Sequence, residues 1–283
     1  MRLLSYRFNG KNTYGVATDD GVVDLGRHFL DRWPDLGAAI ADDGLADLMC
    51  AGSSKSAELS FQEIEFLPTI PNPPKIICVG LNYKSHIEEM ERDAPEYPML
   101  FGRYADSQVG HKQPMVRPKV SDKFDFEGEL AFVVGRTGRH IAAKNALDHI
   151  AGYVCFNDGS VRDYQRHTSQ FMPGKTFWHS GAVGPWMVTV DAVPDPSALS
   201  LTTRLNGAVM QEATTDDLLF DVPTLIEYLS QIAPLVPGTV VATGTTGGVG
   251  AGRVPPVWMA AGDVVEIDIS RIGVLCNTIV DEN

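Results

Sequence analysis

The sequence has few cysteines and comparatively few basic residues, and both shortages exclude classes of protein. Its four cysteines, Cys50, Cys78, Cys155 and Cys276, show no Cys-x-x-Cys spacing, so neither a zinc knuckle nor a disulfide framework is predicted. Lysine and arginine together number 23 against 36 aspartates and glutamates, which gives a formal net charge of -13. Binding to nucleic acid or to an anionic membrane depends on clustered basic residues, so we expect neither partner.

Long apolar segments are also missing. The sequence contains no run of about eighteen apolar residues, and residues 1–7 contain no apolar signal core. We therefore expect a cytoplasmic protein. With 283 residues, of which 44% are hydrophobic and 21% charged, the chain is long enough to bury a substantial core. These quantities favour a globular protein whose partner is a small molecule or another protein.

Residues 1–70 are predicted to form a small N-terminal α/β module, and residues 73–283 a second unit. Four prolines between positions 68 and 74 disfavour regular structure and mark the boundary. The module contains no pairing of catalytic residue types, so we interpret it as structural. Its strands are expected at Leu3–Phe8, Tyr14–Thr18 and Gly21–Leu25, and its helices at Leu36–Ile40 and Leu45–Met49.

The second unit is predicted to be rich in strands. Apolar runs and alternation of polar with apolar residues favour strands, and three segments have apolar residues at helical spacing. The expected strands are Lys75–Gly80, Phe124–Val134, Ala151–Phe156, Trp186–Val190, Leu201–Leu205, Ala208–Gln211, Thr239–Thr243, Gly262–Ser270 and Gly273–Val280. The expected helices are Ser85–Arg92, Ile141–Ile150 and Val222–Ile232.

Two glutamates on one predicted strand are candidate metal ligands. Glu127 and Glu129 are two residues apart, so on a strand they lie on one face with Cα atoms about 6 to 7 Å apart. Both could bind one divalent cation, which would need further oxygen ligands. Asp158, at the end of the strand Ala151–Phe156, is the candidate third carboxylate. The alternatives are a solvent-facing edge strand for the glutamates and an ordinary Asn-Asp-Gly turn for Asp158.

His86 and Glu89 are a candidate catalytic pair. Three residues apart on a predicted helix, they are neighbours on one face, so the carboxylate could hold and polarise the imidazole. A surface helix that carries the two residues by chance is the alternative. The proline-interrupted stretch Asp93–Pro98 favours a segment that moves. We therefore expect residues 84–110 to be weakly packed without ligand and to close over it.

A lysine and a glycine-rich loop complete the candidate residues. Lys175 stands among apolar neighbours and suits an anion or a carboxylate partner, unless it is a surface lysine with a buried stem. The segment Gly244–Gly252 lacks Gly-Lys-Ser/Thr and precedes Arg253-Val-Pro-Pro instead of a helix, so a nucleotide-binding loop is not predicted. We expect its backbone N–H groups and Thr245 to lie close to a small anionic ligand.

Six segments in this order and spacing resemble the fumarylacetoacetate hydrolase superfamily over residues 75–280. The resemblance implies an α+β protein whose catalytic domain is a mixed β-roll or β-sandwich, usually dimeric. We therefore expect a homodimer. The segments are Gly80–Glu89, Phe126–Leu130, Asn157–Asp163, Gly174–Lys175, Gly184–Trp186 and Thr243–Gly250.

The resemblance also implies roles for individual residues. Mg²⁺ or Mn²⁺ would be held at the positions of Glu127, Glu129 and Asp158. Catalytic roles are expected for His86, Glu89 and Lys175, with the first two activating water. Substrate-binding positions are expected at Arg162, Gln165, Gly244 and Thr245.

Two positions depart from the family pattern. Many members have an aspartate three residues after the lysine, where this chain has Trp178 followed by His179, and the usual Thr-Pro is Thr245-Thr246. The first change removes a polar group near the site, and it bears on the identity of the substrate instead of on metal binding.

Three functions are compatible with these residues, the first two acting on a small 2-oxo acid. A metal-dependent hydrolase that cleaves a C–C bond of an acylpyruvate or other 2,4-dioxo acid is favoured, because His86 and Glu89 supply the base that hydrolysis needs. A decarboxylase or tautomerase of oxaloacetate-like or hydroxymuconate-like acids is the first alternative, since enolate stabilisation by a metal serves both reactions. A non-catalytic binding protein is the third, and it would carry these residues without using them.

Overall fold

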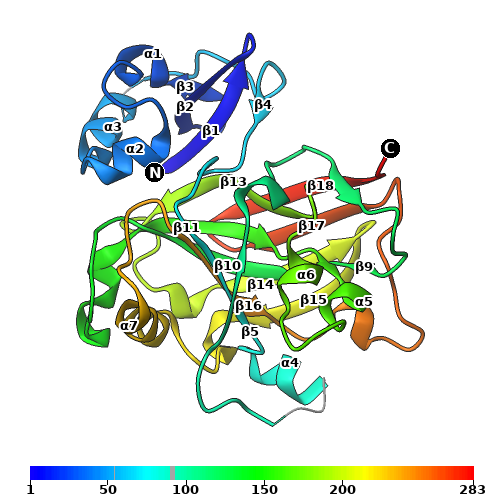
Figure 1. Cartoon of the computed structure of the whole chain (residues 1–283). Coiled ribbons are helices and arrows are strands. Elements are labelled where there is room, and N and C mark those ends of the chain that lie inside the picture. Colours follow the sequence, from blue (N-terminus) through cyan, green and yellow to red (C-terminus); the bar gives the residue numbers. More distant parts are fainter. Residues whose placement is uncertain (54, 90–92) are drawn as a thin grey trace.

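The computed structural model describes residues 1–53, 55–89 and 93–283, and most of its regular structure is strand (Figure 1). The strands in these residues are β1 (Arg2–Phe8), β2 (Lys11–Ala17), β3 (Val22–Asp24), β4 (Glu65–Phe66), β5 (Ile76–Gly80), β6 (Met99–Arg103), β7 (Gln108–Val109), β8 (Met115–Arg117), β9 (Phe124–Asp125), β10 (Gly128–Val134), β11 (Ile150–Asn157), β12 (Ser160–Val161), β13 (Gly181–Thr189), β14 (Ser200–Leu205), β15 (Ala208–Thr214), β16 (Val240–Thr245), β17 (Val264–Ile269) and β18 (Gly273–Asp281).

The helices are short, apart from α7. The α-helices are α1 (Gly26–Phe29), α2 (Leu36–Ala41), α3 (Leu45–Gly52), α4 (Lys84–Glu89), α5 (Arg162–Gln165), α6 (Met172–Lys175) and α7 (Val222–Ile232). Single-turn or longer 3₁₀ segments are η1 (Ala105–Ser107), η2 (Ala143–His149), η3 (Pro196–Ala198), η4 (Thr215–Asp217) and η5 (Gly250–Gly252). None of the helices in the described part of the chain has the length and apolar character needed to cross a membrane.

The strands form two larger sheets and one small one. The largest has the order β3-β2-β1-β13-β11-β10-β16-β5-β6, with β4 paired to β1 and β7 paired to β13. The second has the order β15-β14-β17-β18-β8, and β9 pairs with β12 alone. Both larger sheets mix parallel and antiparallel neighbours, because β5 pairs parallel with β16 and β8 parallel with β18.

The main hydrophobic core lies between the two larger sheets. Leu130 and Phe132 of β10 belong to a buried cluster shared with Leu201 of β14 and Ile267 of β17. Ala131, which points to the other face of β10, belongs to a second buried cluster together with the N-terminal module. A strand that is apolar on both faces is therefore covered on both faces. The expected α+β fold with a β-sandwich is confirmed.

The N-terminal module extends the largest sheet. β1 pairs antiparallel with β13, so that Leu3 lies opposite Met187. Leu36 of α2 and Leu48 of α3 are buried in the second cluster, and they cover the face of the sheet opposite the main core. Figure 1 shows the module at one end of the molecule, in blue. The division into separate domains at residues 68–74 stays a prediction.

One predicted strand is divided. In place of a continuous strand over Phe124–Val134, β9 ends at Asp125 and β10 begins at Gly128. The two parts have different partners, since β9 pairs with β12 and β10 lies between β11 and β16. Glu127 therefore lies in the connection between two strands, and the assumption that both glutamates belong to one strand is wrong.

One predicted helix is also wrong. Residues Ile141–Ile150 do not form an α-helix, because Ala143–His149 form a 3₁₀ segment and Ile150 begins β11. The backbone N–H of Ile141 donates to Ser230 Oγ at 2.9 Å, and that of Ala143 donates to Glu227 Oε1 at 3.0 Å. These side chains of α7 bind the N–H groups at the start of the segment and hold it against α7.

Candidate active site

Glu127, Glu129 and Asp158 lie together next to the ends of β10 and β11. One oxygen of each carboxylate lies within 4.8 Å of the others, and all three side chains are buried. The pairing of Gly128 with Asn157 places Asp158 beside the glutamates, and the Asp158 N–H donates to the carbonyl oxygen of Glu127 at 2.9 Å. An exposed edge strand and an ordinary surface turn are therefore excluded for these residues.

Lys175 and Arg162 bind two of the three carboxylates. Lys175 Nζ donates to Glu127 Oε2 at 2.5 Å and to Asp158 Oδ2 at 2.8 Å. Arg162 Nη1 lies 2.6 Å from Glu127 Oε1. The Lys175 side chain is only 2% exposed. It is a buried partner of carboxylates, as one of the two interpretations of the sequence predicted.

Arg103 was missed by the sequence analysis. Its guanidinium is fully buried and donates from Nη1 to Asp158 Oδ1 at 2.5 Å and to the Gly159 carbonyl at 3.0 Å. Its Nη2 donates to Ser180 Oγ at 2.8 Å. Arg103 comes from β6, 55 residues before Asp158. No local pattern indicates this pairing, because it depends on where β6 lies in the sheet.

Asp125 was also missed, although it alternates with Glu127 and Glu129 in the sequence. Its Oδ2 accepts from Arg162 Nε at 2.7 Å. Its two oxygens also accept the backbone N–H groups of Gly250 and Ala251 at 2.8 and 2.9 Å. Asp125 thus connects Arg162 with the glycine-rich loop. The alternation of three acidic residues was the available signal for it.

Glu127 and Glu129 differ in their electrostatic environment. Burial raises the pKa of Glu129 well above its usual range, and the negative charges of Asp158 and Glu127 raise it further. Burial also acts on Glu127, but the charges of Lys175 and Arg162 outweigh it and lower the pKa to about 2. No cation among the described residues pairs with Glu129.

The three carboxylates fit a hard divalent cation such as Mg²⁺ or Mn²⁺. Carboxylate oxygens are the ligands that these ions prefer, and the cluster in the described residues contains no cysteine or histidine. Two positive charges placed there would remove the repulsion that raises the pKa of Glu129. The donor set and its charge therefore both suit a cation of this class.

A cavity of about 190 Å³ contains the cluster and most of the predicted site residues. Besides the three carboxylates and Lys175, its polar lining includes His86, Arg162, Gln165, Arg166 and Thr245. Met99, Phe101 and Phe171 form an apolar part of the wall, and the two phenyl rings meet edge to face with centroids 5.9 Å apart. The cavity is thus polar and charged in one part and apolar in another.

His86 and Glu89 contact each other as their spacing predicted. His86 Nδ1 lies 3.4 Å from Glu89 Oε2, and Glu89 Oε1 accepts the Gly248 N–H at 2.9 Å. Burial tends to raise the pKa of Glu89, but these bonds outweigh it and lower the pKa. An ionised Glu89 holds His86 through Nδ1 and leaves Nε2 for a ligand in the cavity. The catalytic role of the pair stays a prediction.

The expectation of a weakly packed segment over residues 84–110 is wrong for α4 and for residues 99–110. Ser85 donates to Asp217 Oδ2 through its backbone N–H at 3.1 Å and through Oγ at 2.7 Å. Ile87 of α4 is buried, and β6 pairs with β5 along its whole length. Residues 90–92, which end the predicted helix, lie outside the described residues.

Removal of the Asp217 carboxylate is expected to loosen α4. Asp217→Ala deletes the acceptor of both Ser85 donors, and loss of such a cap costs about 0.5 to 2 kcal/mol. Amide hydrogen exchange in α4 should therefore become roughly 2 to 30 times faster. Asp216→Ala is the matched control, because the exposed Asp216 accepts from Thr214 instead. Equal exchange in the two variants would contradict this role of Asp217.

Gly244 and Thr245 are held by neighbouring groups. The Gly244 N–H donates to Glu129 Oε2 at 2.8 Å, so a contact between substrate and Gly244 would need another of its atoms. Gly244 has φ +106°, and a Cβ there would come within 2.8 Å of Asn82 Cβ, so only glycine fits. Thr245 Oγ1 donates to the Gly128 carbonyl at 2.9 Å and accepts from Gln211 Nε2 at 2.8 Å.

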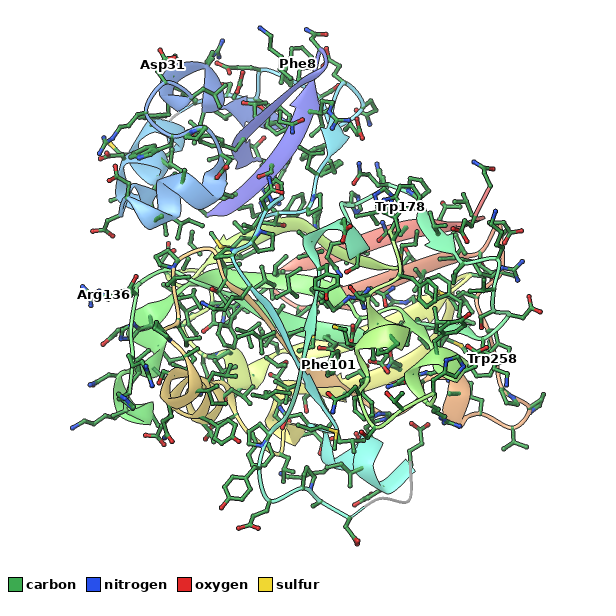
Figure 2. All side chains as sticks on the ribbon, viewed as in Figure 1. Phe8, Asp31, Phe101, Arg136, Trp178 and Trp258 are labelled. Carbon is green, nitrogen blue, oxygen red and sulfur yellow. The ribbon has the colours of Figure 1, made fainter. Side chains whose placement is uncertain are left out.

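Trp178 lies outside the cavity. Its side chain is 57% exposed and stacks on His179 with ring centroids 3.7 Å apart. Figure 2 shows it at the edge of the molecule, away from Phe101. The departure from the family pattern at this position therefore changes the surface instead of the cavity lining, contrary to the expectation from the sequence.

Residues 75–280 match the family model for the C-terminal domain of fumarylacetoacetate (FAA) hydrolase. The chain therefore belongs to the fumarylacetoacetate hydrolase family, as the sequence motifs predicted. It is 38% identical over 290 residues to the human protein named oxaloacetate tautomerase FAHD2A, mitochondrial, and the match covers 99% of this chain and 92% of that protein.

Two solved structures extend the comparison. Fumarylacetoacetate hydrolase from Exiguobacterium antarcticum superposes with a TM-score of 0.88 at 33% identity, and both chains are covered completely. Maleylpyruvate hydrolase from Sphingobium sp. SYK-6, solved with manganese(II) and pyruvate, gives a TM-score of 0.83 at 29% identity, again over both complete chains. These relatives are enzymes, and they include both a tautomerase and hydrolases.

Proposed function

We propose that this protein is a divalent-metal-dependent enzyme that interconverts the keto and enol forms of a 2-oxo acid, with oxaloacetate as the first substrate to test. The observation that carries the proposal is that three buried carboxylates and the imidazole of His86 line one cavity. The similarity over nearly the whole chain, at 38% identity, to a protein named oxaloacetate tautomerase supports this reaction over the hydrolysis that the sequence alone favoured.

Glu127, Glu129 and Asp158 would hold the cation, Mg²⁺ or Mn²⁺. When bound, the ion would polarise the 2-oxo group and stabilise the negative charge of an enolate. Burial opposes the charged form of Lys175, but Asp158 and Glu127 outweigh burial and raise its pKa. Lys175 therefore stays protonated, and it keeps two of the carboxylates oriented through its hydrogen bonds.

His86 would transfer the proton. Tautomerisation moves one proton between C3 and the oxygen on C2, so it needs an acid–base group at C3 and no co-reactant. Nδ1 of His86 faces Glu89, so Nε2 is the atom that would take the proton from C3 or return it. Arg162, whose Nη2 is buried without a partner among the described residues, would donate to the substrate.

Hydrolysis of an acylpyruvate is the second candidate function. The His86–Glu89 pair favours it, because the same imidazole could take a proton from water that attacks a distal carbonyl. The similarity to maleylpyruvate hydrolase supports this candidate as well. A homodimer and a cytoplasmic location stay predictions.

Parallel assays of the Mg²⁺-loaded protein test the proposal. One follows the ultraviolet absorbance of enol-oxaloacetate, one follows pyruvate release from acetylpyruvate, and one follows carbon dioxide release from oxaloacetate. We expect chelator-sensitive acceleration of enol loss above the rate without protein. Pyruvate or carbon dioxide release without accelerated enol loss would contradict the tautomerase and favour the hydrolase or the decarboxylase. Activity in none of the assays would favour a binding protein.

A further inference from the structure

We infer that Arg166 binds a second carboxylate of the substrate, so that the site selects 2-oxo dicarboxylic acids over 2-oxo monocarboxylic acids. The inference rests on the proposed function and deepens it, because it names a class of substrate and the residue that recognises it. Arg166 was not among the residues singled out from the sequence. It lines the same cavity as the carboxylate cluster.

The positive charges of the other cationic side chains of the cavity are already balanced by ion pairs, although Arg162 Nη2 has no hydrogen-bond partner among the described residues. Lys175 is bound by Glu127 and Asp158. Arg162 is bound by Asp125 and Glu127. Arg166 is exposed and forms no ion pair with any described residue, so its guanidinium is free to bind an anion. A guanidinium suits a carboxylate because it can donate two parallel hydrogen bonds.

The balance of charges in the site also points to Arg166. With every group counted as ionised, the buried carboxylates Asp125, Glu127, Glu129 and Asp158 exceed the buried cations Arg103, Arg162 and Lys175 by one charge, a formal sum of -1. A divalent cation would change this to +1, and one substrate carboxylate would bring it to zero. A second carboxylate would be unbalanced without a further cation in the wall. Arg166 supplies that charge.

The backbone at Arg166 is fixed by hydrogen bonds and by the packing of α6 against α5. Its N–H donates to the Asp163 carbonyl at 3.0 Å, and the preceding Gln165 accepts from Arg162 Nη1 at 3.0 Å. A Cβ on Gly174 of α6 would come within 2.4 Å of the Gln165 nitrogen, so α6 packs directly against the end of α5. The fixed backbone limits how far the arginine can move away from the cavity.

The chain after Arg166 adds an apolar wall. Residues 166–171 lead from α5 to α6, and Phe171 at their end lines the cavity beside Phe101. The cavity wall thus offers carboxylates for a cation and phenyl rings for a short carbon chain. It also offers the guanidinium of Arg166, which forms no ion pair with any described residue. A four-carbon acid with a carboxylate at each end matches these three features in kind.

A pair of unreactive ligands tests the inference by binding alone. Malate and lactate share the 2-hydroxy acid group that can chelate a cation, and only malate has a distal carboxylate. Calorimetric titrations of the Mg²⁺-loaded protein should show tighter binding of malate. Arg166→Gln should weaken malate binding about 5- to 30-fold, as loss of a charge-assisted pair implies, and change lactate binding less than about twofold. Arg166→Lys should fall between the parent and Arg166→Gln.

Arg136→Gln is the matched control. Arg136 is also exposed, and Figure 2 shows it at the far edge of the molecule from Phe101. Arg136→Gln should leave the affinities for malate and lactate unchanged. The inference would be overturned by equal weakening of malate and lactate, by unchanged malate binding in Arg166→Gln, or by a parent protein without preference for malate. Because the readout is binding, a protein that lacks tautomerase activity but shows the malate preference would contradict only the proposed reaction.

Discussion

Glu129→Gln is expected to abolish divalent-cation binding and turnover together. The change keeps the size of the side chain and an oxygen that can accept the Gly244 N–H, but it removes the negative charge that a cation would need. We expect the Mg²⁺ affinity to fall at least about 100-fold, which is at the upper end of what changes around metal ligands cost. Calorimetric titration with Mg²⁺ and steady-state kinetics measure the two effects, and a chelator should reproduce the loss of activity in the parent protein.

Stability should distinguish this effect from damage to the fold. Burial and the neighbouring carboxylates raise the pKa of Glu129, so the folded state binds its proton more tightly than the unfolded state does. Ionisation of Glu129 therefore opposes folding as the pH rises above about 4.3, the ordinary value for glutamate. The metal-free Glu129→Gln variant should be at least as stable as the metal-free parent at pH 8.

The matched control for the metal is Glu212→Gln, which changes an exposed glutamate on β15. It should bind Mg²⁺ as the parent does. Unchanged Mg²⁺ affinity in Glu129→Gln, or a large loss of stability in the metal-free variant, would contradict the assignment of the cluster as a cation site.

His86→Gln is expected to lower turnover by about two to four orders of magnitude, the usual contribution of a positioned acid–base group. The variant loses the imidazole that lies 3.4 Å from Glu89, while Lys175 keeps its hydrogen bonds to Glu127 and Asp158. Mg²⁺ affinity should therefore stay within about threefold of the parent. Steady-state kinetics with enol-oxaloacetate, combined with the Mg²⁺ titration, measures the separation of the two effects.

His28→Gln is the control for this variant, because His28 is an exposed histidine of α1 in the N-terminal module. It should retain the parental rate. A His86→Gln enzyme that also worked at the parental rate would remove the imidazole from the mechanism and leave the cation cluster as the only catalytic element. A variant with reduced Mg²⁺ affinity would instead place His86 among the groups that support the cluster.

Those residues of the candidate site that short sequence patterns indicate could be predicted from the sequence. Spacing alone indicated Glu127 with Glu129 and His86 with Glu89, and the motifs in register indicated Asp158 and Lys175. The joining of these segments depends on long-range pairing, such as Gly128 opposite Asn157, which no local pattern encodes. The family resemblance supplied that information, and it also supplied the fold.

The residues that were missed or misjudged depend on distant partners. Arg103 reaches Asp158 across 55 residues, and Asp217 binds Ser85 across 132 residues. The proline-interrupted sequence after α4 gave no sign that Asp217 holds this helix, so weak packing was a reasonable but wrong expectation. In the segment Ile141–Ile150, where a helix was predicted, Ala143–His149 form a 3₁₀ segment whose start is bound by side chains of the distant α7.

The glycine-rich loop constrains how this enzyme can change. The Gly248 N–H binds Glu89, and the N–H groups of Gly250 and Ala251 bind Asp125. One short stretch of backbone therefore supports both the proposed proton-transfer pair and the charged groups around the proposed cation site. A substitution that shifts this backbone would alter both at once, so the two halves of the chemistry cannot be adjusted independently there. Variation in substrate range should instead accumulate at Arg166 and Phe171, which line the cavity from the connection between α5 and α6.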